Sequence, residues 1–313
     1  MALTDDFKTL TNAFSGLGVD EKSLISILGN SQLEERKCFR KGTPHLFKED
    51  ERLFERWNDD RVRLLKHEFM RFKNAVVLWA MHPWERDARL VKEALKKGPE
   101  VHGVIVEIAC TRSSEELLGA RKAYHSLFDH SIEEDVSYHI DGPESKLLVA
   151  LVSAYRYEGP KVNKDTAKSE AQTLSHAIKN ADSSNPIEDD EVIRILSTRS
   201  RAHLQEVYKH YKEIFGHNID EDVDANLRLK ETMLCLCTPQ TYFSNVLEVS
   251  LRNDVDKNTK KGLTRVIVTR ADTDMNLIKE QYHNQYGVSL SSKIGDTANG
   301  NYKDFLLTLV ART

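Results

Sequence analysis

Three segments of the chain align with one another and decide the fold. They read IACTRSSEELLGARKAYHSLFDHSI from Ile108 to Ile132, ILSTRSRAHLQEVYKHYKEIFGHNI from Ile195 to Ile219, and VIVTRADTDMNLIKEQYHNQYGVSL from Val266 to Leu290. In each segment a Thr-Arg pair is followed, at fixed offsets, by a tyrosine, a second aromatic residue and an aliphatic residue. Three matches at the same offsets indicate internal repeats.

A fourth repeat fits before these three. Its stretch SLISILGN, from Ser23 to Asn30, has Gly29-Asn30 where the other repeats have Thr-Arg. We therefore predict four repeats, at residues 1–81, 82–158, 165–239 and 240–313. The polar segment YEGPKVNKD, Tyr157 to Asp165, predicts a joint between two halves of two repeats each.

The spacing of apolar residues within a repeat is helical. Between Gln205 and Phe215 they fall at Val207, Tyr208, Tyr211, Ile214 and Phe215, which is the pattern of a helix with one buried face. We see no convincing run of period-two alternation, so we predict an all-α fold with several short helices per repeat. The Thr-Arg pairs are interpreted as structural, with a hydroxyl near a helix end and an arginine reaching across the bundle.

Composition excludes several classes of protein. The 313 residues include 45 Lys+Arg and 49 Asp+Glu, a net charge of −4, without the basic excess of a nucleic-acid-binding protein. The longest clear apolar run, Ala75 to Met81, is far shorter than the roughly 20 residues of a membrane span. The first residues, MALTDD, do not resemble a secretory signal, and the four cysteines imply no disulfide framework. We expect a soluble cytoplasmic protein.

Four helical repeats of this length resemble the annexins. The resemblance covers essentially the whole chain and includes FSGLGVDE at Phe14 to Glu21, HPWERDA at His82 to Ala88 and GLTRV at Gly262 to Val266; the last two look most like plant annexins. It implies a slightly curved disc of four five-helix repeats. The interhelical loops on its convex face would bind Ca²⁺ and dock reversibly on acidic phospholipid, without catalysis.

The first repeat carries the closest match to the family's calcium pattern, which is Gly-x-Gly-Thr plus an acidic residue about 40 positions later. The resemblance implies that the ligands are the carbonyls of Phe14, Gly16 and Gly18 and the carboxylate of Glu68. Val19 replaces the threonine, and an insertion, plausibly within Lys48 to Asp60, lengthens the spacing. An alignment without a gap places His67 at the ligand position, and a plain helix-helix turn with an unrelated Glu68 is the alternative.

The fourth repeat departs from the pattern. Its loop NDVDKNTKK, Asn253 to Lys261, resembles the start of an EF-hand, but Thr259 and Arg265 stand where that motif requires Gly and Glu. An EF-hand is therefore rejected. A family-like site would use the carbonyls of Asn253, Val255 and Lys257 with the acidic stretch Asp296-Thr297. A degenerate, lysine-bearing loop that contacts phosphate directly is the alternative.

The middle repeats lack the glycine turn. The second has KKGPE at Lys96 to Glu100, and the third has KNADSSNPIEDD at Lys179 to Asp190, which we interpret as a solvated cap for the helix at Glu191. We expect no calcium site of the family type in either. Because the protein is net negative, a bound calcium would have to reverse the local charge and accept lipid phosphate oxygens. Lys22 and Leu17 could add contacts to phosphate and lipid.

Other motifs carry less weight. Cys110 with Cys235 or Cys237 are the nearest counterparts of a redox pair proposed in plant annexins, but buried thiols in a core are the favoured interpretation. A peroxidase role for His45 or His67 is disfavoured. The glycines from Gly98 to Gly103 have P-loop spacing, but Val104 replaces the required lysine.

Two further classes of function stay open beside membrane binding. One is a helical-repeat scaffold that binds protein or cytoskeleton with a weak calcium response or none. The other is a redox enzyme, which would need a reactive cysteine or haem. The resemblance leaves actin or another annexin as candidate protein partners, although Ile193-Arg194-Ile195, a short motif suggested for actin binding, is better interpreted as helix core.

Overall fold

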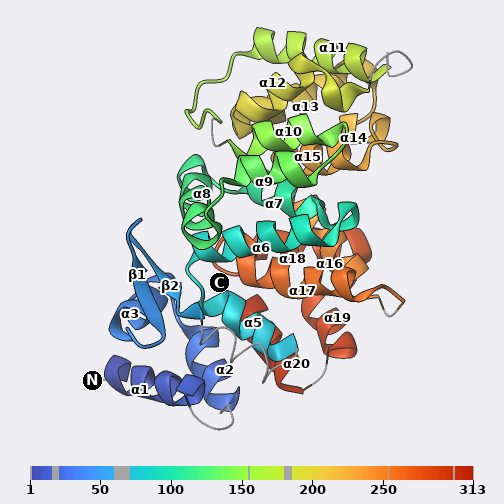
Figure 1. The fold of residues 1–313 in the computed structure, drawn as a ribbon. Helices are drawn as coiled ribbons and strands as arrows, with labels where there is room; N and C mark the ends of the chain where they lie inside the picture. The colour runs from blue at the N-terminus through green and yellow to red at the C-terminus, as the bar shows by residue number, and fades with distance from the viewer. Residues whose placement is uncertain are drawn as a thin grey trace. The chain divides into compact units, whose positions relative to one another are not determined.

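The computed structural model describes residues 2–15, 21–59, 71–153, 156–179, 185–252, 254–298 and 300–312. These residues contain nineteen α-helices, two short 3₁₀ helices and one β-hairpin (Figure 1). The predicted all-α fold is confirmed, with the hairpin as an exception.

The chain divides into two compact units. Residues 1–86 and 243–313 form the first unit, and residues 87–242 form the second. The first and fourth repeats thus share one unit, and the second and third share the other. The prediction of sequential halves meeting at Tyr157 to Asp165 is wrong, because the helices that pack together come from repeats that this scheme separates.

The second unit contains two successive sets of helices. The first set is α6 (Pro83–Lys97), which begins in the first unit, η1 (Pro99–Val101), α7 (Gly103–Thr111), α8 (Ser114–Phe128), α9 (Ile132–His139) and α10 (Glu144–Val152). The next is α11 (Lys164–Lys179), η2 (Pro186–Glu188), α12 (Asp190–Thr198), α13 (Arg201–Phe215), α14 (Ile219–Asp222) and α15 (Leu227–Cys237). Helix α7 packs on α15, and this contact joins the second repeat to the third.

The first unit joins the two ends of the chain. Its N-terminal part contains α1 (Ala2–Ser15), α2 (Glu21–Asn30), α3 (Leu33–Gly42), β1 (Phe47–Asp50), β2 (Phe54–Trp57) and α5 (Arg71–Ala80). Its C-terminal part contains most of α16 (Pro239–Ser250), then α17 (Lys257–Arg270), α18 (Met275–Tyr286), α19 (Leu290–Thr297) and α20 (Gly300–Val310). The pairs α2 with α20 and α5 with α17 pack together.

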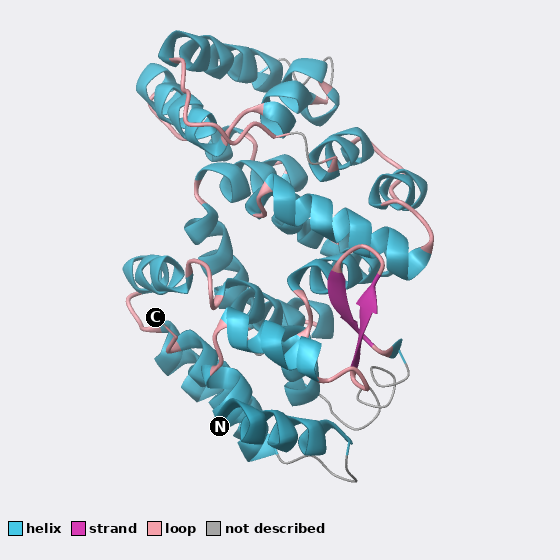
Figure 2. Cartoon of the chain, turned by 90° about the vertical axis from the view of Figure 1, so that its left-hand side faces the viewer, coloured by secondary structure: helices cyan, strands magenta, loops and turns pink. Residues whose placement is uncertain are grey.

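The hairpin, magenta in Figure 2, begins one residue before the charged segment Lys48 to Asp60, the plausible place of the insertion, and ends inside it. Strands β1 and β2 are antiparallel, with Phe47 opposite Trp57 and ring centroids 4.3 Å apart. Phe39 of α3 packs against Phe47, and the Trp57 backbone N–H donates to a Glu85 carboxylate oxygen 2.9 Å away. These strands were not predicted, because four-residue strands are too short for a clear period-two signal.

A glycine lets α2 and α20 approach each other closely. A Cβ on Gly29 would lie 2.5 Å from Cγ2 of Thr308, a separation that requires something to move. This contact explains why the first repeat has glycine where the other repeats have the threonine of Thr-Arg.

Two arginines replace the missing Thr-Arg pair at this contact. Arg36 and Arg312 both form ion pairs with Asp272 of the fourth repeat, and their side chains are at most 8% exposed. Arg312 also donates to the Gly29 carbonyl, 2.7 Å away, and the Arg36 guanidinium lies 3.8 Å from the centre of the Trp79 ring. These contacts tie the two ends of the chain together.

Removing the shared carboxylate should destabilise this unit. We expect Asp272→Ala to lower the free energy of unfolding by about 2–3 kcal/mol, because two buried guanidinium groups lose their counter-ion. Urea unfolding followed by circular dichroism measures the effect, with Asp304→Ala as a control for an exposed aspartate of the same unit. Equal unfolding midpoints for the two variants would contradict this assignment.

Candidate calcium-binding loops

The first-repeat site falls mostly outside the described residues. Phe14 is in the last turn of α1, two residues before the first helix-helix loop, whereas Gly16, Gly18 and Glu68, together with His67, Leu17 and Val19, lie outside the described ranges. Helices α1 and α2, which flank these loop residues in the sequence, pack on each other. A loop of glycine carbonyl ligands has to connect two neighbouring helices, and this packing is compatible with the predicted site.

The fourth-repeat loop connects α16 to α17. Asn253 lies outside the described residues, Asp254 is exposed and Val255 is partly buried. Asp256 caps α17, because its Oδ1 accepts the backbone N–H groups of Asn258 and Thr259 at 2.6 and 3.2 Å. Its other oxygen accepts the Thr259 hydroxyl at 2.5 Å. These hydrogen bonds, the Thr259 hydroxyl first, hold the pKa of Asp256 below its ordinary value.

The cap changes the interpretation of this loop. The Asp254, Asp256 and Asn258 spacing that resembles an EF-hand comes from a helix N-cap, which agrees with the rejection of that motif. Lys257 is the first residue of α17, where a backbone carbonyl ordinarily accepts a hydrogen bond from four residues ahead. Of the carbonyls that we expect to be ligands here, Val255 therefore keeps the freest position among the described residues.

The expected acidic partner lies at the end of α19. Asp296 is exposed in its last turn, and Thr297, its last residue, donates its hydroxyl to the Lys293 carbonyl at 2.9 Å. Asp296 therefore presents an exposed carboxylate, whereas the Thr297 hydroxyl is engaged within its own helix.

The middle repeats have loops of different chemistry. Gly98 takes a left-handed conformation, with φ of 102°, directly before η1, and Lys97 forms an ion pair with Glu93. In the third repeat, Asp189 caps α12 by accepting the N–H groups of Glu191 and Val192 at 2.9 and 3.0 Å. The prediction of a helix cap is confirmed. Within the described ranges, no three His, Cys, Asp or Glu side chains cluster to hold a metal ion. A site built mainly from backbone carbonyls, as predicted here, needs only one such side chain.

The Thr-Arg pairs are structural, as predicted. Each threonine hydroxyl donates to the carbonyl four residues earlier, at 2.6 Å for Thr111, 2.6 Å for Thr198 and 2.9 Å for Thr269. Arg112 donates two hydrogen bonds to Asp87 of α6, at 2.6 and 3.0 Å. Burial alone would lower the pKa of Arg112. The charge and hydrogen bonds of Asp87 oppose burial, and the pKa lies above its ordinary value.

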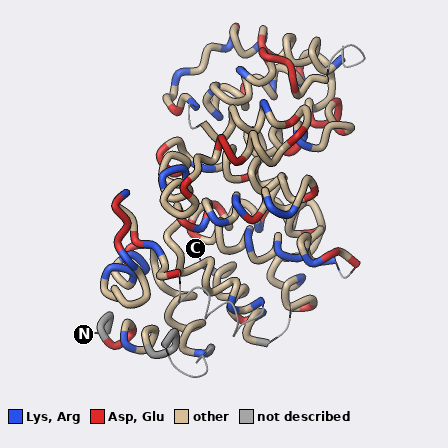
Figure 3. Tube along the Cα trace, in the orientation of Figure 1, with Lys and Arg blue, Asp and Glu red and all other residues tan. Residues whose placement is uncertain are grey.

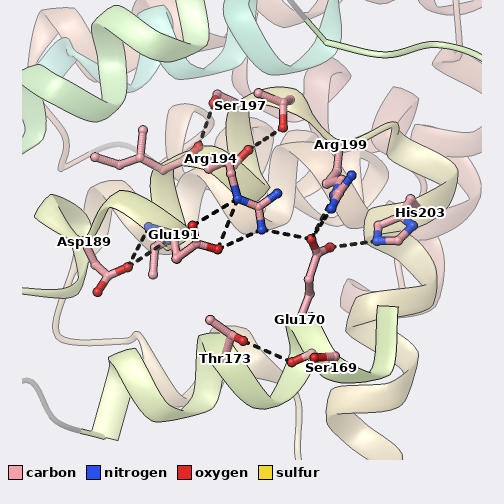
Figure 4. Close-up of polar contacts among 12 residues, drawn as sticks. Ser169, Glu170, Thr173, Asp189, Glu191, Arg194, Ser197, Arg199 and His203 are labelled. Carbon is pink, nitrogen blue, oxygen red and sulfur yellow. Dashed lines mark hydrogen bonds and ion pairs between the residues drawn. The ribbon is translucent and has the colours of Figure 1, made fainter. Parts of the chain in front are cut away.

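The corresponding arginine of the third repeat belongs to a larger cluster. Glu170 of α11 accepts from Arg199 at 2.6 and 2.8 Å, from Arg194 at 3.1 Å, and lies 2.8 Å from His203 (Figure 4). Burial raises the pKa of Glu170, but the hydrogen bonds from Arg199, His203 and Arg194 outweigh burial and hold it below its ordinary value.

The fourth repeat uses a different arrangement. Arg270 pairs with Asp274 one turn ahead, with both distances 2.7 Å, and its guanidinium lies 4.8 Å from the centre of the Phe243 ring. Phe243 belongs to the first helix of its repeat, as Asp87 and Glu170 do in theirs. The arginine thus reaches the first helix in all three repeats, through a carboxylate in two of them and an aromatic ring in the third.

The aligned tyrosines are structural as well. Tyr124, Tyr211 and Tyr282 are fully buried, and their hydroxyls donate to Asp135, Asp222 and Glu248 respectively. Each ring packs against the aromatic residue four positions later, with centroids 4.7–4.9 Å apart. Burial, followed by the carboxylate partner, raises the pKa of all three tyrosines.

The other motifs behave as core. Cys110, Cys235 and Cys237 are buried, and burial raises the pKa of Cys110 to about 11 and that of Cys237 to about 12. Such thiols are poor nucleophiles, in contrast to a low-pKa redox cysteine. Ile193 and Ile195 are 7% and 0% exposed, so both isoleucines of the three-residue actin motif belong to the core, whereas Arg194 between them is 40% exposed. His45 is exposed.

A family model for annexins matches residues 86–151, 169–230 and 251–309. Over its full length the chain is 56% identical to annexin D4 of Arabidopsis thaliana, covering all of that protein. It is 38% identical to annexin-like protein RJ4 of Fragaria ananassa, covering 98% of this chain and 95% of the relative. The structure resembles that of annexin III with a TM-score of 0.82 at 25% identity, covering 99% of this chain and 94% of the other.

The Glu170 cluster predicts a pH-dependent stability. We expect Glu170→Gln to lower the free energy of unfolding by about 2 kcal/mol at pH 7, because Arg194, Arg199 and the buried His203 lose the carboxylate that they share. Because the folded-state pKa of Glu170 is depressed, its contribution is complete above the unfolded value near 4.3 and is lost as the pH falls further.

Urea unfolding at pH 7 and at successively lower pH measures this difference between wild type and Glu170→Gln. Glu188→Gln, at an exposed glutamate of η2, is the matched control. A difference that stays constant down to pH 3 would show that the Glu170 charge is not responsible.

Thiol reactivity gives a further prediction. In the native protein a colorimetric disulfide reagent should label Cys38 alone, because Cys38 is exposed and the other three thiols are buried. In urea all four cysteines should react. Rapid labelling of a second thiol in the native state would favour the redox interpretation.

Proposed function

The chain belongs to the annexin family, and from this membership we propose that it binds acidic phospholipid membranes through calcium held in its interhelical loops. Calcium-dependent phospholipid binding is the general property of annexins, and the chain has it as a member. What we propose beyond that is where the calcium binds, and that binding is peripheral and reversible from the cytoplasm. Within the described ranges, no helix combines the length and apolar character that crossing a bilayer would require.

The observation that carries the proposal is the contrast between loops. The first repeat keeps the sequence FSGLG, whose Phe14 and Ser15 are the last two residues of α1 and whose two glycines precede α2 in the sequence. The second and third repeats use a Gly-Pro turn and an aspartate cap in the same place. We therefore assign the principal calcium site to the first repeat, with the carbonyls of Phe14, Gly16 and Gly18 and the Glu68 carboxylate as ligands.

The fourth repeat is proposed as a weaker site. Calcium binding there is favoured by the exposed carboxylate of Asp296 and by the position of Val255 outside α17. It is disfavoured by Asp256, whose oxygens accept the hydrogen bonds of the helix cap. The lysines of this loop offer a direct contact to phosphate as the alternative.

The charge of the protein explains why calcium is required. With a net charge of −4, the protein has no general attraction for an anionic membrane. A Ca²⁺ ion bound by neutral carbonyls and one carboxylate leaves local positive charge and open coordination positions. Lipid phosphate oxygens fill those positions, and chelation of calcium releases the protein.

We assign no catalytic reaction to the protein. Cys110 and Cys237 are buried and their pKa values are raised, so they are poor candidates for a redox pair. The buried isoleucines make the Ile193-Arg194-Ile195 motif a poor contact for actin. The scaffold function remains the competing proposal, since three of the four calcium loops depart from the family pattern.

Co-sedimentation with phosphatidylserine vesicles tests the assignment. Wild type should pellet with calcium and stay in the supernatant with chelator. Glu68→Ala should lose most calcium-dependent pelleting, with the calcium midpoint raised at least about tenfold, because the only carboxylate ligand of the site is removed. Asp296→Ala should cause a smaller shift.

Two controls sharpen this test. Asp304→Ala removes an exposed carboxylate of α20 and should behave as wild type. His67→Ala tests the ungapped alignment, and a loss in His67→Ala with no loss in Glu68→Ala would transfer the ligand role. Pelleting that needs no calcium, or no pelleting at all, would favour the scaffold.

A further inference from the structure

A cleft of about 730 Å³ lies in the second unit, between the segment that leads into α11 and the junction of α12 with α13. This volume is in the range of sites for small molecules. The lining residues are all within the described part of the chain, and none of them is acidic. Three have basic side chains: Lys161, Lys164 and Arg199.

The walls of the cleft are fixed by hydrogen bonds. The Tyr157 backbone N–H donates to the Thr198 carbonyl at 3.0 Å. Arg156 donates to the carbonyls of Arg199 and Leu196 at 2.7 and 2.6 Å. The start of the segment that carries Lys161 is therefore held to the end of α12 by hydrogen bonds.

The cations of the cleft are available to a ligand. Lys161 and Lys164 are exposed, and no ion pair among the described residues includes either of them. Figure 3 shows basic residues spaced along the segment that leads into α11. Arg199 uses Nε and one terminal nitrogen to bind Glu170, which holds the guanidinium in place while its side chain stays 36% exposed.

Two helix N-termini open on the same cleft. Asn163 caps α11 by accepting the Thr166 N–H at 3.0 Å, and Ser200 caps α13 by accepting the His203 N–H at 3.2 Å. Both caps line the cleft. Helices of 16 and 15 residues place partial positive charge at these ends, and the first turn of α13 contains no acidic residue.

Glu170 and Glu158 are the acidic groups nearest in the hydrogen-bond network, and both are engaged. Glu170 is shared among Arg194, Arg199 and His203, so the cations outnumber it. Glu158 accepts the Ser114 backbone N–H at 2.7 Å. One further carboxylate, Asp165, is exposed in the first turn of α11 beside the cleft, although it is not a lining residue. The three basic lining residues outnumber it, so the cleft favours anions although the protein as a whole is acidic.

We propose that this cleft binds the phosphate group of a small phosphorylated ligand, without calcium. Lys161, Lys164 and Arg199 supply the charge, and the two helix N-termini supply backbone N–H donors. The cleft has room for more than phosphate, and the half-exposed ring of Tyr157 at its edge offers a surface for a planar group.

The position of the cleft separates it from the calcium loops. Arg199 follows the last residue of α12 and binds Glu170 in the first half of α11, so the two helices run antiparallel. Helix η2 and the start of α12, which belong to the third repeat's counterpart of a calcium loop, therefore lie at the other end of these helices from the cleft. The proposal does not rest on the calcium sites.

Binding measurements in chelator test the proposal. Isothermal titration with adenosine monophosphate and with inorganic phosphate should show saturable binding that weakens as salt is raised. Lys161→Gln with Lys164→Gln should weaken it at least about tenfold, since two charge-assisted contacts are lost. Lys168→Gln, at an exposed lysine of α11 outside the cleft, should bind as wild type.

A vesicle arm identifies the source of the phosphate. Pelleting with phosphatidylinositol 4-phosphate vesicles in chelator, lost in the double variant, would support a lipid headgroup as the ligand, whereas binding of adenosine monophosphate alone supports a soluble one. No saturable binding of any probe, or equal binding by the double variant, would overturn the proposal. The double variant should keep calcium-dependent pelleting with phosphatidylserine, which shows that it is folded and separates this result from a failure of the calcium proposal.

Discussion

The pairing of an arginine at the end of a repeat's second helix with a buried carboxylate of its first helix is the interaction on which the rest of the structure depends. Arg112 is held by Asp87 and Arg199 by Glu170, in each case a carboxylate near the start of the repeat's first helix. A charge taken out of water must be paired, so this contact fixes the two helices antiparallel and in one register. The turn between them then lies at the opposite end, free to vary in sequence. Calcium chemistry can therefore be present in one repeat and absent from the next without loss of the fold.

The first and fourth repeats show how the fold tolerates loss of that pair. Arg270 reaches the ring of Phe243 instead of a carboxylate, and it takes Asp274 from its own following turn. In the first repeat Gly29 lets α20 approach, and Arg36 and Arg312 meet at Asp272. Because Asp272 and Arg312 belong to the fourth repeat, the substitute contact also joins the two ends of the chain.

Much of the helical fold could be predicted from sequence, because the periodic residues are the buried ones. Tyr124, Tyr211 and Tyr282 are fully buried, and the threonines beside the arginines bond to their own helices. The hairpin could not be predicted, since its strands are four residues long and rich in charge. The grouping of the repeats into two units could not be predicted either. It depends on the contacts of α7 with α15 and of α2 with α20, which join segments far apart in the sequence. At the fourth-repeat loop, the sequence suggested ligands where the structure has a cap. An aspartate two residues before an asparagine serves either purpose, and only the hydrogen bonds of Asp256 distinguish them.

The central claim is that one calcium ion is shared between the protein and lipid phosphate. If so, lipid must tighten calcium binding as much as calcium tightens lipid binding, because the two equilibria are linked. The direct measurement is a calcium titration of the wild-type protein, with and without phosphatidylserine vesicles and with phosphatidylcholine vesicles as control. The account predicts that the apparent calcium affinity rises at least about tenfold with phosphatidylserine alone. An affinity that is the same in all three conditions would contradict it.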